Sequence, residues 1–138
     1  MKSLKVIAVS IVLGLALTAC GSTEVDTGKG ETGEENITYK QISAEEAMEL
    51  METEEDYIIL DVRTQEEYDE KHIPGAVLVP NETIGKNDIN ELPDKDQMIL
   101  VYCRSGNRSK QASGKLIQLG YTNVYEFGGI NSWPGEVE

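Results

Sequence analysis

The sequence predicts an α/β domain over residues 37–138, with a largely parallel central sheet flanked by helices. Short apolar segments alternate there with segments whose apolar residues recur at helical spacing, an order typical of strand–helix units. Two of the apolar segments, "YIILDV" and "MILVY", are apolar nearly throughout, which favours strands buried on both faces of a parallel sheet. The length of this span suits one small domain with a core of ordinary size.

The expected elements follow one another along this span. "ITYKQI" predicts a short first strand, and "AVLV" and "NVYEF" predict the third and the last strand. Ser43 and Thr64 each precede a helical segment and have a glutamate three residues later, which is the capping-box pattern of a helix start. A polar, partly helical stretch is expected up to Asp96. The helix after "MILVY" is expected to bury three residues and to end at a glycine: Ala112, Leu116, Leu119 and Gly120.

The N-terminus has the pattern of an export signal. Two lysines precede an apolar stretch from Val6 to Leu17, which is too short to span a bilayer as a mature helix. The segment "LTAC" that follows resembles the lipobox of bacterial lipoproteins, which implies that Cys20 becomes the first mature residue and carries the lipid. We therefore expect a signal peptide over residues 1–19, then a lipidated cysteine with a flexible acidic linker over residues 20–36. The protein is expected to be exported and anchored to the outer face of a bacterial cell membrane, or to a membrane facing the periplasm.

Cys103 is then the only thiol of the mature chain. A lone cysteine has no partner for an intramolecular disulfide. The sequence holds one histidine, His72, which leaves too few nitrogen and sulfur ligands for a zinc site, so no metal and no cofactor are expected. Cys103 directly follows "MILVY" and precedes a helix, which places it at the carboxyl end of a strand. Open parallel sheets bind their ligands at that edge.

The loop "CRSGNRS" has the composition of an anion site. Gly106 permits a tight turn in which successive backbone N–H groups and the helix N-terminus face an anion. The same field stabilises a thiolate, so we expect a lowered pKa for the Cys103 thiol. The alternative is a buried cysteine that acts as a small hydrophobic residue, but an inert cysteine does not need such a loop.

The charge distribution also favours an anionic ligand here. The formal net charge of the chain is −13, yet no acidic residue occurs between Gln97 and Tyr125. The basic residues of that stretch are Arg104, Arg108, Lys110 and Lys115. A basic region on an acidic protein attracts small anions, while the overall charge repels nucleic acid. Lysines on a solvated helix face explain the last two residues, but not the two loop arginines.

Four separated segments resemble, in order, the signatures of single-domain rhodaneses: "LDVRTQEEYDEKHIPGA", "VYCRSGNRS", "LGYTNVYEFGG" and Trp133. Rhodaneses are sulfurtransferases that carry sulfane sulfur as a cysteine persulfide. The resemblance implies a single rhodanese-like domain over residues 37–138 with Cys103 as the nucleophile. It also implies that the backbone amides of the following loop bind the persulfide and the anionic donor, with Arg104 meeting the donor and Arg108 closing the cradle. The implicated loop residues are Arg104, Ser105, Gly106, Asn107 and Arg108.

The resemblance gives supporting roles to the other matching residues. Asp61 and Arg63 match a pair that supports the loop and its surroundings. His72 matches a structural position and receives no catalytic role. The remaining matches are turn and core residues: Gly128, Gly129 and Trp133.

The implied reaction is a sulfur transfer in two displacements. The Cys103 thiolate attacks the outer sulfur of thiosulfate or a similar anion and expels sulfite, and the persulfide sulfur then passes to a thiol or to cyanide. Such covalent catalysis gives ping-pong kinetics. The domain is expected to work as a monomer.

Three other functions fit parts of the pattern. Phosphatases share this fold and a Cys…Arg loop, but they need one residue more between the two than the four that Cys103 and Arg108 enclose. A non-catalytic rhodanese module on a lipid anchor also fits, although such modules usually lose the cysteine or the loop. A redox sensor would use Cys103 as an exposed thiol of low pKa that forms a sulfenic acid.

Overall fold

The computed structural model describes residues 38–138, which lie within a compact unit formed by Glu34–Glu138. The predicted signal peptide, the lipidated Cys20 and most of the linker lie outside the described residues. Within the described part, no helix has the length and apolar character needed to cross a membrane.

Five parallel strands form one sheet in the order β1-β5-β4-β2-β3. The strands are β1 (Lys40–Gln41), β2 (Tyr57–Asp61), β3 (Val77–Leu78), β4 (Met98–Cys103) and β5 (Val124–Gly129). The central strand β4 is buried over nearly its whole length, which explains its uninterrupted apolar sequence. The short strands β1 and β3 form the edges. The predicted α/β fold with a parallel sheet is confirmed.

The helices are α1 (Ala44–Thr53), α2 (Gln65–Glu70) and α3 (Asn107–Gln118), with 3₁₀ turns η1 (Asn81–Thr83) and η2 (Ile130–Ser132). Both predicted capping boxes are confirmed. The Ser43 hydroxyl accepts the Glu46 N–H at 3.1 Å, and the Glu46 carboxylate accepts the Ser43 N–H at 2.7 Å. Thr64 makes the same reciprocal pair before α2. The polar stretch before β4 contains the single turn η1 as its only described helical part.

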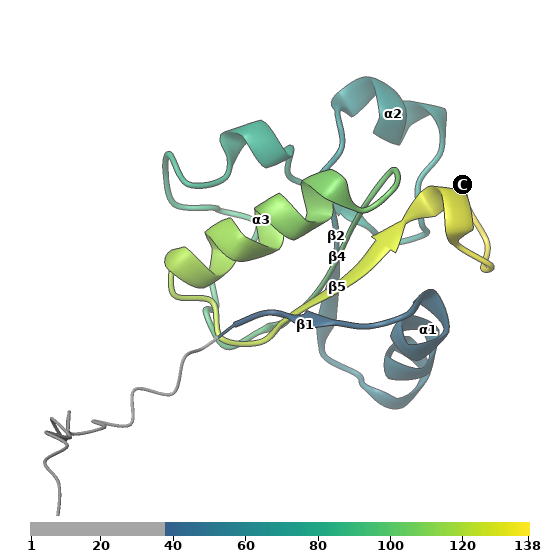
Figure 1. The fold of residues 1–138 in the computed structure, drawn as a ribbon, viewed down its shortest axis with the longest axis horizontal. Helices are drawn as coiled ribbons and strands as arrows, with labels where there is room; N and C mark the ends of the chain where they lie inside the picture. Colours follow the sequence, from purple (N-terminus) through teal and green to yellow (C-terminus); the bar gives the residue numbers. More distant parts are fainter. Residues whose placement is uncertain (1–37) are drawn as a thin grey trace, which may run out of the picture. The chain divides into compact units, whose positions relative to one another are not determined.

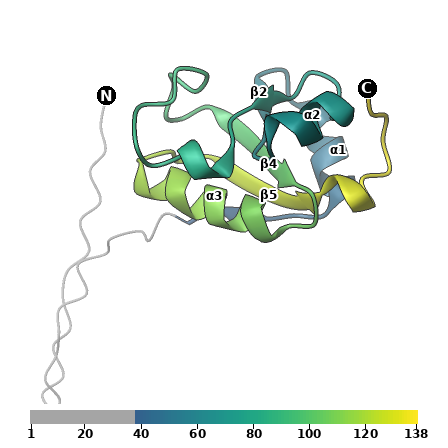
Figure 2. The same ribbon diagram turned by 90° about the horizontal axis from the view of Figure 1, so that it is seen from above.

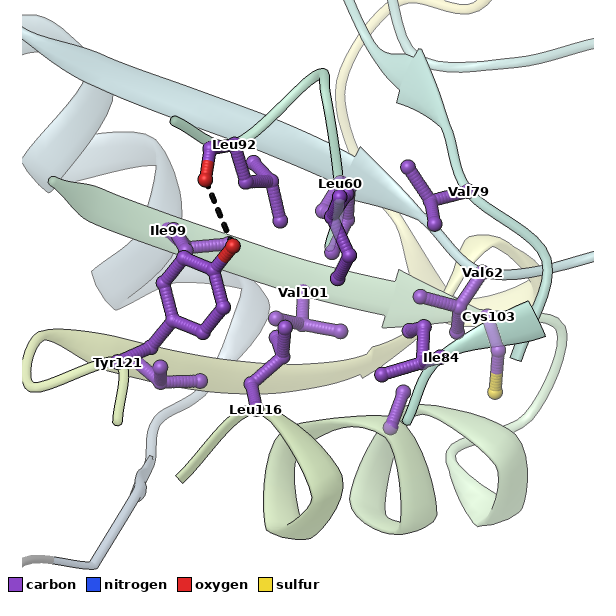
Figure 3. Packing of buried hydrophobic residues seen from close by; sticks show 13 residues of the cluster. Leu60, Val62, Val79, Ile84, Leu92, Ile99, Val101, Cys103, Leu116 and Tyr121 are labelled. Atoms are coloured by element: carbon purple, nitrogen blue, oxygen red, sulfur yellow. Dashed lines mark hydrogen bonds between the residues drawn. The ribbon is translucent and has the colours of Figure 1, made fainter. Parts of the chain in front are cut away.

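The helix α3 covers one face of the sheet, and α1 covers the other (Figure 1). The core on the α3 side runs from Tyr121, whose hydroxyl donates to the Leu92 carbonyl at 2.6 Å, to Cys103 at the opposite end (Figure 3). Ala112 and Leu116 are fully buried there, as predicted. Leu119 is only partly buried, because it lies at the end of α3 next to solvent.

The core on the α1 side is rich in aromatic residues. Tyr102 of β4 and Phe127 of β5 pack with their ring centroids 5.6 Å apart, and Trp133 packs on Phe127 at 5.4 Å. Trp133 is partly buried and covers this cluster from the C-terminal segment. Figure 2 shows this segment and α2 at the same end of the sheet as the arrowheads of β4 and β5.

Candidate active site

Cys103 ends the central strand, where its sulfur points toward the first turn of α3 (Figure 3). The residue is only 1% exposed. The expectation of an exposed thiol was therefore wrong, because the β4–α3 loop and the core on the α3 side enclose Cys103.

The loop after Cys103 wraps around the sulfur. The Gly106 N–H donates to Sγ at 3.0 Å. Gly106 has φ +113°, a left-handed conformation that side chains rarely adopt, and α3 starts at the next residue. The sulfur thus lies at the N-terminus of a twelve-residue helix, where backbone N–H groups favour negative charge.

The hydrogen bonds of this loop decide the protonation of Cys103. Burial alone raises the pKa of the thiol. The Ser109 hydroxyl and the backbone N–H groups of Ser109, Gly106 and Ser105 lower it by more, so the net shift of the Cys103 pKa is downward. This is the direction expected from the sequence.

Gly129 lets the loop pack directly on β5. A Cβ atom at this position would collide with the backbone of Arg104 and Ser105. The Asn131 N–H donates to the Arg104 carbonyl at 3.2 Å and fixes the loop from the same side. Gly129 is therefore more than a turn residue, because its missing side chain makes room for the cysteine loop.

The two loop arginines differ in their surroundings. Arg104 is exposed, makes no ion pair with a described residue, and lines a pocket of about 160 Å³. The other residues that line this pocket are Arg63, Glu67, Glu70, Lys71, Ile130 and Asn131. Arg108 instead forms two parallel hydrogen bonds of 2.7 Å with the Glu67 carboxylate of α2. Arg104 is thus the more available guanidinium for an anionic donor.

The Glu67 bond raises the pKa of Arg108, and the nearby Cys103 charge contributes in the same direction. The role of Arg108 in closing the cradle around the anionic sulfur donor stays a prediction. The structure shows that Arg108 ties the start of α3 to α2.

Replacing Glu67 by Gln should weaken the fold at neutral pH but not in strong acid. The Arg108 hydrogen bonds, opposed by burial and aided by Thr64, lower the pKa of Glu67 to about 2. The stabilisation is thus present above the ordinary glutamate pKa and is lost as the pH falls toward 2. We expect a loss of about 1–3 kcal/mol near neutral pH. Urea unfolding of wild type and Glu67→Gln at several pH values checks this, and a difference that persists unchanged in strong acid contradicts it.

Asp61 and Arg63 form a buried ion pair on the opposite face of the sheet from Cys103. Arg63 Nη2 donates to Asp61 Oδ2 at 2.6 Å and to the Lys71 carbonyl at 2.7 Å. The Tyr102 hydroxyl donates to the same Asp61 oxygen at 2.6 Å and accepts the Ile73 N–H at 3.1 Å. The network ties β2 and β4 to the segment after α2. The role of Asp61 and Arg63 in supporting the cysteine loop stays a prediction.

His72 lies in a structural setting. Its ring stacks on Tyr68 with centroids 3.8 Å apart, and its Nε2 lies 3.3 Å from a Glu138 carboxylate oxygen. Its backbone pairs with that of Glu138 through hydrogen bonds of 2.8 and 2.9 Å. His72 therefore holds the C-terminal segment and has no hydrogen bond to the cysteine loop.

Two polar residues that the sequence reasoning did not assign lie directly behind Cys103. The Ser109 hydroxyl is fully buried, with its Oγ 3.4 Å from Cys103 Sγ, and Glu126 of β5 is 3% exposed. The Ser109 hydroxyl donates to Glu126 Oε1 at 2.6 Å. The available signal was Glu126 itself, an acid within an otherwise apolar strand at the end of the acid-free stretch.

The model of the Rhodanese-like domain family matches residues 43–136. The chain belongs to the rhodanese family. The thiosulfate sulfurtransferase GlpE of Coxiella burnetii is 38% identical over 98 residues, which are 70% of this chain and 89% of that protein. The thiosulfate sulfurtransferase PspE of Escherichia coli is 37% identical over 71 residues, or 51% of this chain and 68% of its own length.

Solved structures of rhodanese-like proteins have the same fold. A rhodanese-related protein from Thermoplasma volcanium superposes with a TM-score of 0.61 at 30% identity. The match covers 72% of this chain and 98% of that one. That structure consists almost entirely of the matched domain, so we expect the unit Glu34–Glu138 to fold as a separate chain in experiments as well.

Proposed function

We propose that this protein is a sulfurtransferase that accepts sulfur from thiosulfate or a similar anion as a persulfide on Cys103. The observation that carries the proposal is the position of Cys103 Sγ, 3.0 Å from the Gly106 N–H at the start of α3. The rhodanese relatives that are named thiosulfate sulfurtransferases support the choice of donor.

The loop supplies electrostatic stabilisation for both displacements. The donor anion enters beside the exposed Arg104, and the Cys103 thiolate forms a bond to its outer sulfur. The S–S bond of the donor breaks, and its electron pair leaves with sulfite. Backbone N–H groups at the start of α3 then stabilise the terminal sulfur of the persulfide, as they favour negative charge in general.

The second displacement transfers that terminal sulfur to an external acceptor. Cyanide or a thiolate attacks it, and the Cys103 thiolate leaves. Cys103 is the single cysteine of residues 38–138, so an acceptor thiol has to come from another molecule. This arrangement predicts that the free enzyme and the persulfide enzyme alternate, with one substrate released before the other binds.

Initial-rate kinetics with the unit Glu34–Glu138 test this proposal. Thiosulfate and cyanide are varied against each other while thiocyanate is measured. Parallel double-reciprocal plots are the expected result, because sulfite leaves before cyanide reacts. Intersecting plots, or no thiocyanate above the uncatalysed rate, would contradict a persulfide cycle with these substrates.

We also propose that the protein is a lipoprotein anchored through Cys20. The support is the order of the N-terminal segments: lysines, an apolar stretch and the lipobox-like "LTAC". A lipid anchor and the following acidic linker would hold the rhodanese domain near the outer face of a membrane.

Replacing Cys20 by Ala should abolish lipid attachment and leave an uncleaved precursor, because the lipidated residue is then missing. Metabolic labelling with a fatty acid and intact mass of the full chain, expressed in a bacterium, measure both effects. A matched Ser22→Ala variant should be processed normally. A wild-type mature chain that starts at a residue other than Cys20 would contradict the lipobox.

A further inference from the structure

A buried carboxylate lies behind the nucleophile. The Glu126 side chain reaches the α3 face of the sheet, where its Oε1 accepts the Ser109 hydroxyl at 2.6 Å and the Gly128 N–H at 2.9 Å. Its Oε2 accepts the Gln41 side-chain amide at 3.3 Å. No lysine or arginine of residues 38–138 forms an ion pair with it. A buried acid without a cationic partner is costly, and packing alone does not explain it.

Ser109 has one hydroxyl proton for several possible acceptors. Its Oγ lies 2.6 Å from Glu126 Oε1 and 3.4 Å from Cys103 Sγ. The carbonyl groups of Gly106 and Gly128 are at 2.9 and 3.2 Å. An ionised carboxylate at the shortest distance is the strongest of these acceptors. While Glu126 is ionised and Cys103 is a neutral thiol, the Ser109 hydroxyl hydrogen therefore points to Glu126, and the thiol donates to the Ser109 lone pair. The Ser109 hydroxyl lowers the pKa of Cys103 only through the other arrangement, in which it turns and donates to the thiolate.

We propose that Cys103, Ser109 and Glu126 form a chain that shares one proton, with Glu126 as the acceptor when Cys103 becomes the nucleophile. This inference rests on the proposed function of Cys103. In the resting arrangement, the thiol donates to Ser109 Oγ and the hydroxyl donates to Glu126. In the reactive arrangement, the thiol proton has passed to Oγ and the hydroxyl proton to Oε1. The thiolate then accepts from Ser109, and neutral Glu126 donates to Ser109, so no proton leaves the chain and its net charge is unchanged.

Among residues 38–138, no other ionisable side chain forms a hydrogen bond or an ion pair with Cys103, Ser109 or Glu126. Arg104 and Lys110 are exposed. Arg108 is paired with Glu67, and the charge of Glu82 in η1 also raises the pKa of Arg108. The groups bonded on the opposite face of the sheet, or at its edge, are Asp61, Arg63, Tyr102, Lys40 and Tyr125. Within residues 38–138, Glu126 is thus the carboxylate linked to Cys103 through a hydrogen-bonding side chain.

Two substitutions in this chain should change the thiol in opposite directions. In Glu126→Gln, the rival negative charge is gone, and the amide N–H can donate to Ser109 as the neutral acid would. The thiolate should then form at lower pH. In Ser109→Ala, Glu126 stays ionised and the thiolate loses its hydroxyl donor, so the thiolate should form at higher pH. If Ser109 and Glu126 only supported the fold, both substitutions would shift the pH at which the Cys103 thiolate forms in the same direction.

The rate of Cys103 alkylation by iodoacetamide measures the thiolate fraction without requiring sulfur transfer. In the unit Glu34–Glu138 at about pH 6, we expect Glu126→Gln to react at least about tenfold faster than wild type, and Ser109→Ala about tenfold slower. The rates should converge in alkali. Glu66→Gln, which removes the same charge from an exposed site on α2, should follow the wild type.

Equal or slower alkylation of Glu126→Gln would overturn the inference, and so would a shift of both variants in one direction. The wild-type profile gives a second criterion that needs no variant. A shared proton produces two steps of rising reactivity with pH, whereas an isolated thiol produces one step. Sulfite release is measured separately on the same samples. If wild type releases none from thiosulfate, the proposed function fails, while the alkylation profiles still decide whether the proton is shared.

Discussion

Replacing Cys103 by Ser should abolish sulfur loading and sulfite release. The serine hydroxyl is a much weaker nucleophile than a thiolate, and the same loop amides do not ionise it at neutral pH. Activity should fall to the uncatalysed rate, while the fold remains, because oxygen replaces sulfur at a site already surrounded by hydrogen-bond donors. Sulfite release from thiosulfate and a thermal melt of the same preparation measure the two effects.

Arg104→Lys is the matched control for this substitution. It keeps the charge beside the pocket and changes only the shape of the donor group. A partial loss of activity is expected, mainly as weaker binding of thiosulfate. Turnover that persists in Cys103→Ser would contradict the nucleophilic role, whatever Arg104→Lys does.

Replacing Arg63 by Met should destabilise the fold more than any surface substitution. Asp61 is fully buried, and without Arg63 its carboxylate would keep only hydrogen bonds such as that from Tyr102. Breaking one partner of a buried ion pair costs about 3–5 kcal/mol, because the other charge stays buried without compensation. Chemical denaturation of the unit Glu34–Glu138 measures the change in the free energy of unfolding.

The double variant Asp61→Leu/Arg63→Met tests the cause of that loss. With both charges removed, the desolvation cost disappears, so the double variant should be more stable than Arg63→Met alone. If the double variant is the less stable of the two, the arginine acts through packing or through its bond to the Lys71 carbonyl, and not through the charge of Asp61.

Most of the fold was predictable from local sequence signals. The capping boxes at Ser43 and Thr64 and the apolar run of β4 correspond to elements that form for local reasons. Leu119 was predicted to be buried and is only partly so. The helical pattern predicts on which face of α3 Leu119 lies. It does not predict how far Leu119 lies from the end of the sheet, because that distance depends on tertiary packing.

The site was predictable in part, for physical reasons that differ from residue to residue. The loop around Cys103 could be identified because the backbone N–H groups that contact its sulfur all belong to one contiguous segment. The burial of Cys103 and the pairing of Arg108 with Glu67 depend on elements far apart in the sequence. The contact of Ser109 with Glu126 joins α3 to β5, and no local pattern fixes that distance.

The central claim is that Cys103 carries the transferred sulfur, and intact mass spectrometry tests it most directly. The unit Glu34–Glu138 is incubated with thiosulfate, desalted and measured before and after treatment with cyanide, with peptide mapping to locate any added mass. The proposed function predicts the gain of one sulfur atom on Cys103, an equal amount of sulfite, and loss of that mass with cyanide. An unchanged mass, or added sulfur that also appears on the Cys103→Ser variant, would contradict it.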